Sequence, residues 1–225
     1  MLERLIATLR GRSKGPLISC LFLGFALSGC AVGRSEIDIM SPTAVTSMST
    51  ALVKIVDVKD QRKFEAAPGQ PSTPSLEKPA DINNPAITSR AYARKRNGYG
   101  KALGDIILPE GRTIAGLIRA ATQKALEDKG YRVVDQNSPD YARAMPVSVE
   151  VNEFWTWISI GFTASVQCRV AVGVNGSMFA TAPTVIQASG MNDSVFVIER
   201  TFAEVSKQGL DDLTAKMEAQ IRPPS

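Results

Sequence analysis

The sequence predicts an α+β domain in which an antiparallel sheet of about four strands has two helices packed on one face, in the order β-α-β-β-β-α. Apolar and polar residues alternate at 145–157 and 162–174, which is typical of strands with one face in water. Apolar residues recur with the period of an amphipathic helix at 112–129 and 202–221. Two such helices bury their apolar stripes by sharing one face of a sheet, and the polar face is then expected in solvent.

The first strand is expected at Ala51–Lys59, which is dense in β-branched residues. At its end, Asp57, Asp60 and Arg62 are compatible with a paired-carboxylate site, but they are more typical of a strand-end ion pair. Residues 65–85 contain five prolines among Gly, Ser, Asp and Asn. We therefore expect a long, exposed and poorly ordered loop there.

A basic, tyrosine-containing run follows at 90–101. Its side chains are suited to lipid phosphates, peptidoglycan or an acidic partner, and they are equally suited to a solvated loop. We favour the loop, with a turn at Asn97-Gly98. The basic residues of the run are Arg90, Arg94, Lys95, Arg96 and Lys101.

The first helix is expected at Arg112–Lys129. Thr113 or Glu110 is placed to help cap its start, and Gly130 stands where a C′ glycine ends a helix. Its apolar face is formed by Ile114, Leu117, Ile118, Ala121 and Ala125.

Three strands are expected next, at Met145–Trp157, at Phe162–Val174 and within Met178–Met191. Residues 159–161 would connect the first two, and Asn175-Gly176 would form the next hairpin turn. Cys168 falls on the apolar face of the middle strand, so we expect a small core residue there and not a nucleophile.

The last helix is expected at Phe202–Ile221. Thr201 and Glu204 have the spacing of a capping box at its start. Gly209 would weaken its middle by about 1 kcal/mol relative to alanine.

Phe154, Trp155 and Trp157 place three aromatic side chains within four residues at the end of a strand. Such a cluster could form a surface for a partner, a glycan or the membrane interface. The alternative is that two of the three cover the edge of the sheet.

Residues 1–29 have the three parts of a secretory signal. Four basic residues open it. Pro16–Gly29 is then an uncharged, mostly apolar run of fourteen residues, too short for a bilayer core of about 30 Å, which needs about 20 residues. The run closes on Leu27, Ser28, Gly29 and Cys30, which resemble the bacterial lipobox.

The lipobox resemblance implies diacylglycerol on the Cys30 sulfur, cleavage after Gly29, and a fatty acid such as palmitate on the new N-terminus. Two alternatives stay open: lipidation at Cys20, or an ordinary signal peptide with Cys30 unmodified. Ala31 in place of the retention signal Asp implies the outer membrane, with the domain facing the periplasm. The alternative location is the periplasmic leaflet of the inner membrane.

The chain would then comprise a signal peptide at 1–29, a lipidated N-terminus with a flexible tether at 30–50, and one α+β periplasmic domain at 51–225 with its Pro-rich loop at 65–85. An alternative is that part of the tether packs as an extra strand. Without residues 1–29 the chain has 22 basic and 21 acidic residues, so its net charge of +4 falls to +1. This balance gives no reason to expect nucleic acid as a partner.

The chain has no histidine, which excludes Ser-His-Asp triads, Cys-His dyads and imidazole zinc sites. With Cys30 acylated, Cys168 is the only remaining thiol, so no intrachain disulfide is expected. We find no metal cluster or phosphate-binding glycine loop in the sequence. We therefore expect no cofactor, no catalytic residues and no enzymatic activity.

Asp60-Gln61-Arg62, Gly130-Tyr131 and the order of elements resemble the YajG-type lipoproteins of Gram-negative bacteria. The resemblance covers about residues 50–220 and implies a location and a fold, but no catalytic residues. The first function hypothesis is a membrane-anchored lipoprotein with a non-enzymatic binding or scaffolding role towards an envelope protein or peptidoglycan. The alternative is an accessory lipoprotein of an envelope ABC transporter or lipid-transfer assembly.

Overall fold

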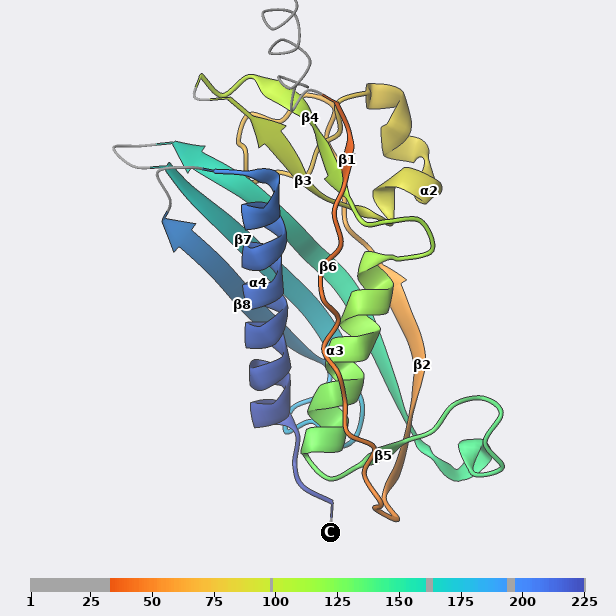
Figure 1. Cartoon of the computed structure of the whole chain (residues 1–225). Coiled ribbons are helices and arrows are strands. Elements are labelled where there is room, and N and C mark those ends of the chain that lie inside the picture. The colour runs from red at the N-terminus through yellow and green to blue at the C-terminus, as the bar shows by residue number, and fades with distance from the viewer. Residues whose placement is uncertain (1–32, 98, 161–163, 194–196, 225) are drawn as a thin grey trace, which may run out of the picture. The chain divides into compact units, whose positions relative to one another are not determined.

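Residues 33–97, 99–160, 164–193 and 197–224 are described by the computed structural model of the chain (Figure 1), and they belong to one unit, Val32–Ser225. Within these ranges, none of the helices combines the length and hydropathy that crossing a bilayer requires. The helices are α2 (Pro85–Thr88), α3 (Ile114–Asp128) and α4 (Glu199–Gln220), with 3-10 turns at Pro79–Asn83 and Tyr141–Arg143.

The sheet is mixed and has eight strands in the described ranges, which corrects the expected antiparallel sheet of about four. The pairs β1–β4, β2–β5, β2–β6 and β3–β6 are parallel, and the pairs β3–β4, β6–β7 and β7–β8 are antiparallel. The strands are β1 (Ser35–Glu36), β2 (Leu52–Asp60), β3 (Ala91–Arg96), β4 (Ala102–Ile107), β5 (Arg132–Val133), β6 (Met145–Ile160), β7 (Ala164–Asn175) and β8 (Thr184–Asp193).

Strand β6 explains why the sheet is larger than expected. It spans sixteen residues, and its two ends have different partners on the same side. The first half pairs with β2, from Val53↔Met145 to Asp60↔Val151, and the second half pairs with β3 at Ala93↔Thr156. Parallel partners arrive through long connections, so no hairpin turn in the sequence announces them.

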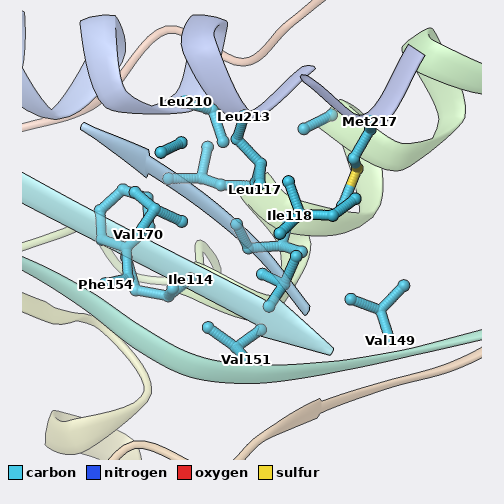
Figure 2. Packing of buried hydrophobic residues seen from close by; sticks show 14 of the residues in the cluster. Ile114, Leu117, Ile118, Val149, Val151, Phe154, Val170, Leu210, Leu213 and Met217 are labelled. Atoms are coloured by element: carbon cyan, nitrogen blue, oxygen red, sulfur yellow. The ribbon is translucent and has the colours of Figure 1, made fainter. Parts of the chain in front are cut away.

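The prediction that both long helices lie on one face of the sheet is confirmed (Figure 1). Figure 2 shows side chains of α3, α4, β6 and β7 meeting in one core. Each fully buried Leu, Ile or Val contributes about 1.5–3 kcal/mol relative to an exposed one. The central residues are Ile114, Leu117, Ile118, Val149, Val151, Phe154, Val170, Leu210, Leu213 and Met217.

A β-bulge near Asn152 changes the phase of β6. Before it, Val149 and Val151 face the helices. The register with β7 then shifts between Val151 and Glu153, so Phe154 takes the core position that strict alternation would give to Glu153. One extra residue in a strand moves every later side chain to the opposite face.

The helix ends agree only partly with their predicted caps. The Thr113 side chain accepts a hydrogen bond from Gly116 N and caps α3, as expected, and Gly130 follows with φ +96°. Helix α4 instead starts at Glu199, after Ile198, without a side-chain cap. The capping box predicted from Thr201 is therefore wrong, because the helix begins before that residue.

Gly209 has a packing role that the helix pattern alone does not show. A Cβ placed on it would lie 3.0 Å from the Cys168 sulfur, and one placed on Gly190 of β8 would lie 2.3 Å from Val205 O of α4. Two glycines thus let α4 lie directly on β7 and β8. Cys168 is buried there, as expected.

The Pro-rich segment is the largely exposed loop that its composition indicated, but one part of it packs against the sheet. Leu76 is fully buried and packs with Phe64 and Ile82 over Ala91 and Ile107. This second cluster lies on the face of β3 and β4 away from the long helices. The polar face of the sheet is therefore covered at this end, whereas β8 exposes outward side chains such as Val185. Long insertions without regular structure can still bury a few well-placed apolar side chains.

Candidate functional site

The predicted lipidation site lies outside the described residues. This holds for Leu27, Ser28, Gly29 and Cys30, and for the alternative Cys20. The structure begins at Gly33, three residues after Cys30.

The aromatic cluster expected as a partner surface is buried. Phe154 and Trp155 are fully inaccessible, and Trp157 is 9% exposed. Trp155 donates from Nε1 to Pro71 O at 3.1 Å and stacks edge-on against Phe64. The alternative, in which aromatics cover the sheet, fits this burial, because the Pro-rich segment lies over Trp155. Phe154 differs and belongs to the core beneath the helices.

The ion pair expected at the end of β2 is present, with the Arg62 side chain buried and the Asp60 side chain 22% exposed. The Asp60 carboxylate accepts from Arg62 Nε at 2.9 Å and from Nη2 at 2.7 Å. The same guanidinium donates to Ala91 O at 2.6 Å, Phe154 O at 3.2 Å and Thr88 O at 2.7 Å. Arg62 therefore joins the end of β2 to β3, β6 and α2.

Asp57 takes no part in this cluster. It pairs with Lys59 at 3.4 Å on the surface, so the alternative of a paired-carboxylate site with Asp60 is not supported. Its separation follows from strand geometry, because residues three apart in β2 point to opposite faces of the sheet.

Residues 33–41, expected to belong to a flexible tether, are held along the domain. Gly33 N donates to Leu103 O at 2.6 Å, and Ile37 N donates to Ile107 O at 2.9 Å. The Tyr92 hydroxyl donates to Ile37 O, and Arg112 donates to Ile39 O. The alternative of an extra strand is thus correct for β1, which pairs with β4. We name residues 33–41 the N-terminal strap.

Three consecutive polar residues of the strap find charged partners that are far away in the sequence. Arg34 reaches Asp105 at 3.1 Å. Ser35 bonds Glu199 at 2.8 Å, and Glu36 pairs with Arg90. These contacts connect the strap to β4, to α4 and to the residue before β3, so they fix the direction in which it leaves the domain.

Asp105 is the most buried acid of this network. Burial raises the pKa of its carboxyl above the ordinary value, while hydrogen bonds from Glu77 N and from the Arg34 guanidinium oppose the rise. Since the carboxylate has no exposed surface, it needs these donors when ionised. Arg34 also pairs with Asp81 beside it.

Lys95 forms a second ion pair, in which the lysine is buried and the glutamate is partly exposed. Its ammonium donates to Glu199 Oε1 at 2.6 Å and to Ser35 Oγ at 2.9 Å. The hydrogen bond from Lys95 lowers the pKa of the Glu199 carboxyl. This three-residue cluster links β3, the strap and the first turn of α4, where a negative charge also meets the positive end of the helix dipole.

Gly104 allows the strap to approach β4. Its φ is +143°, and a Cβ added there would lie 1.9 Å from Gly33 O. No side chain fits at that distance. The position therefore requires glycine both for its backbone angle and for its contact.

The described residues offer little for catalysis. No group of three or more His, Cys, Asp or Glu side chains in the described ranges is placed to hold a metal ion. Burial raises the pKa of the Cys168 thiol to about 12, which suppresses the reactive thiolate. What the geometry provides is a rigid domain whose N-terminal segment is fixed by hydrogen bonds and ion pairs.

Sequence reasoning missed the strap and its partners. Lys95 had been placed in a solvated loop, but it lies in β3. Tyr92-Ala93-Arg94-Lys95 does not alternate between apolar and polar residues, so the segment carried no period-2 signal for a strand. Pairing between residues 34 and 105 leaves no local pattern at all.

No family model and no curated protein matches this sequence. Three solved structures are similar in arrangement. A Xanthomonas campestris protein of the family DUF330 is 9% identical over 82% of this chain and 95% of that chain, with a TM-score of 0.43. A minor lipoprotein from Acinetobacter baumannii is 16% identical over 46% of this chain and 80% of that chain, with a TM-score of 0.33. A PelC dodecamer from Paraburkholderia phytofirmans is 12% identical over 82% of this chain and 97% of that chain, with a TM-score of 0.30.

These identities and TM-scores are too low to assign the chain to a family or to transfer a function to it. One of the three structures is a lipoprotein by name. The resemblance to YajG-type lipoproteins therefore stays a prediction from the sequence.

Proposed function

We propose that this chain is a lipoprotein of the bacterial cell envelope, anchored through acylated Cys30, whose folded part has a non-enzymatic binding or scaffolding role. The observation that carries the proposal is the run Leu27-Ser28-Gly29-Cys30 at the end of a fourteen-residue apolar segment. Two or three acyl chains on one residue give stable attachment, whereas a single chain does not.

Two further observations support the proposal. The described residues from Gly33 onward form one unit with its own apolar core, which is compatible with cleavage before Cys30. The sequence features shared with YajG-type lipoproteins also lie within the folded part, at Asp60-Gln61-Arg62 and Gly130-Tyr131. Arg62 holds three strands and a helix together there, which gives the first of these motifs a structural role.

Metabolic labelling with a radioactive fatty acid tests the anchor. Wild type should be labelled and cleaved, Cys30→Ser should be unlabelled and remain as precursor, and Cys20→Ser should behave as wild type. If labelling persists in Cys30→Ser and disappears in Cys20→Ser, the lipid is on Cys20 and the proposed site is wrong. Absence of label in all three would indicate an ordinary signal peptide.

The membrane in which the protein resides is proposed from Ala31. In a host that retains lipoproteins with Asp after the acylated Cys, Ala31→Asp should move the protein from the outer to the inner membrane. Density-gradient fractionation measures the shift, and Ala31→Ser is the matched control that should stay in place. An outer-membrane pool unchanged by Ala31→Asp would refute the sorting proposal without affecting lipidation.

The binding role is tested by recovering the lipidated protein from detergent extracts of envelopes. We expect the protein to be recovered together with peptidoglycan or with one envelope protein. This association should be lost when surface residues that contact the partner are changed, and it should be retained in control variants that leave the fold unchanged. Stable recovery with subunits of an ABC transporter would instead identify an accessory lipoprotein of that assembly.

A further inference from the structure

The strap limits how far the domain can stand from a membrane to which Cys30 is attached. Gly33 is fixed on β4 by its hydrogen bond to Leu103 O, and its carbonyl touches Gly104. Three residues of fully extended chain span about 10 Å. An acylated Cys30 is therefore within about 10 Å of this point on the sheet, and no long tether intervenes.

The direction of the strap selects the end of the domain that meets the membrane. Strand β1 runs parallel to β4, with Ser35 opposite Ile106. The chain before Ser35 therefore heads towards the start of β4 and the turn that joins β3 to β4. That turn lies at one end of the domain, and β5 and the C-terminus lie at the other (Figure 1).

This turn has the composition of a membrane-facing surface. Tyr99 is 97% exposed, and Lys101 is exposed beside it. No Asp or Glu occurs between Arg90 and Asp105 in the sequence. In the described ranges Arg94, Arg96 and Lys101 have no ion-pair partner, whereas Arg90 and Lys95 are neutralised by Glu36 and Glu199.

A depression of about 460 Å³ opens next to the turn. Arg96, Tyr99 and Trp157 contribute to its lining, together with Gln70 and Ser72. Arg96 donates to Gly100 O at 2.9 Å, which leaves guanidinium donors for another acceptor. Guanidinium groups bind phosphate oxygens readily, and Tyr and Trp side chains are enriched at membrane interfaces.

We propose that the β3–β4 turn rests on the membrane that holds the anchor, and that Arg96 and Lys101 bind the phosphates of anionic phospholipids there. Tyr99 lies in the headgroup layer beside them. The proposal rests on lipidation at Cys30 and deepens it, because it gives the anchored domain one fixed orientation. The face with the β7–β8 strands and the end with β5 then remain free for other contacts.

Fluorescence quenching in vesicles tests the orientation. The lipidated protein with Tyr99→Cys, labelled with a polarity-sensitive dye, is reconstituted in vesicles of phosphatidylethanolamine and phosphatidylglycerol that contain a headgroup spin label. Asn137→Cys, in the exposed loop after β5, is the matched control. Native Cys168 is buried and leaves the new thiol as the reactive one.

The Tyr99→Cys dye should be strongly quenched and blue-shifted, and the Asn137→Cys dye should not. Adding Arg96→Gln and Lys101→Gln should markedly reduce the quenching, and so should phosphatidylcholine vesicles. Unchanged melting and an unreactive Cys168 show that these variants are folded.

Two results would overturn the proposal while the anchor stands. One is equal, weak quenching at both positions in protein that carries the fatty acid. The other is strong quenching at Tyr99→Cys that is insensitive to lipid charge and to both substitutions, which would show contact without recognition of anionic headgroups. Failure of the anchor itself has a separate readout, the absence of fatty acid on Cys30.

Discussion

The two halves of this domain are held together by different forces. Around β6, β7, β8 and the long helices, the contacts are mainly apolar and buried, and this core extends to Tyr92 and Ile106 of the other half. At the end formed by β1, β3 and β4, ion pairs such as Arg34–Asp105 and Lys95–Glu199 join segments far apart in the chain. The stabilisation from apolar burial does not depend on pH, whereas that from an ion pair depends on the protonation states of both partners. The comparison predicts that the first half determines whether the chain folds, and the second determines whether the strap stays in place.

A single buried charge should unfold the apolar half. Val170→Asp buries an unpaired carboxylate in a site without exposed surface, which costs several kcal/mol, comparable to the roughly 5–15 kcal/mol of a whole domain. We expect loss of the cooperative melt and rapid reaction of Cys168 with a thiol reagent.

Val185→Asp is the matched control for this change, because Val185 is 62% exposed on the neighbouring strand. Its effect should stay within about 0.5 kcal/mol. If Val170→Asp melts like wild type and Cys168 reacts in the native protein, the assignment of the β7 core face would be wrong.

The ion pair at Arg62 joins the two halves, so removing its charge should have the second largest effect. Arg62→Met leaves Asp60 without its partner and breaks the bonds to three carbonyl groups. Leaving a buried acceptor without its hydrogen-bond donor costs about 1–3 kcal/mol, and this substitution does so at the buried carbonyl groups of Ala91 and Phe154. Urea unfolding should show this loss, whereas Lys59→Met, which removes a surface pair with Asp57, should be nearly neutral. Equal effects of the two substitutions would contradict the structural role of Arg62.

A methyl group at Gly104 should release the strap and leave the apolar half folded. Gly104→Ala puts a Cβ where Gly33 O now lies. Hydrogen exchange at the amides of Gly33 and Ile37 should become faster, while the amides of β7 stay protected. Gly69→Ala, where nothing lies within 4 Å of the added carbon, should change neither. Uniformly faster exchange would mean that the strap and the core are one cooperative unit.

Acid should weaken the second half through Glu199, with the smallest effect of the four. Its folded-state pKa is lowered by the hydrogen bond from Lys95. The pair therefore contributes its stability above the ordinary glutamate pKa of about 4.3 and loses it as the pH falls through the lower folded value. A partly exposed pair of this kind contributes at most about 1 kcal/mol.

Melting temperature measured against pH checks this effect. The wild type should exceed Glu199→Gln near neutral pH, and the gap should close in acid. Lys95→Met should remove the same pH dependence, and the double variant should add nothing further. If the difference in melting temperature between wild type and Glu199→Gln persists at a pH below the folded-state pKa of Glu199, the effect comes from packing and not from the ion pair.

The sequence predicted the apolar half well because its signals are local. The alternation at 164–174 and the stripe from Ile114 to Ala125 each lie within one element, and both describe the observed core. Prediction failed where the partners are distant. Strand β3 was taken for a loop because its six residues include Arg94, Lys95 and Arg96. The acidic partners of Lys95 and Arg34 are distant in the sequence, so no local pattern indicates them.

Two other errors have simple physical causes. The prolines of 65–85 correctly indicated the absence of long regular structure, but they gave no sign that Leu76 would be buried. The aromatic cluster was considered as one surface or as cover for the sheet edge. Phe154 and Trp155 in fact lie on opposite faces, as neighbours in a strand do, and the bulge near Asn152 decides that Phe154 faces the helices. A single extra residue in a strand cannot be recognised from alternation alone.

The long sequence separations of the strap contacts also fix the order in which the chain can assemble. Arg34 needs Asp105, and Ser35 needs Glu199, a residue near the end of the chain. Contacts between such distant positions form late, because the loop between them must close first. The strap therefore docks after the rest of the domain is made.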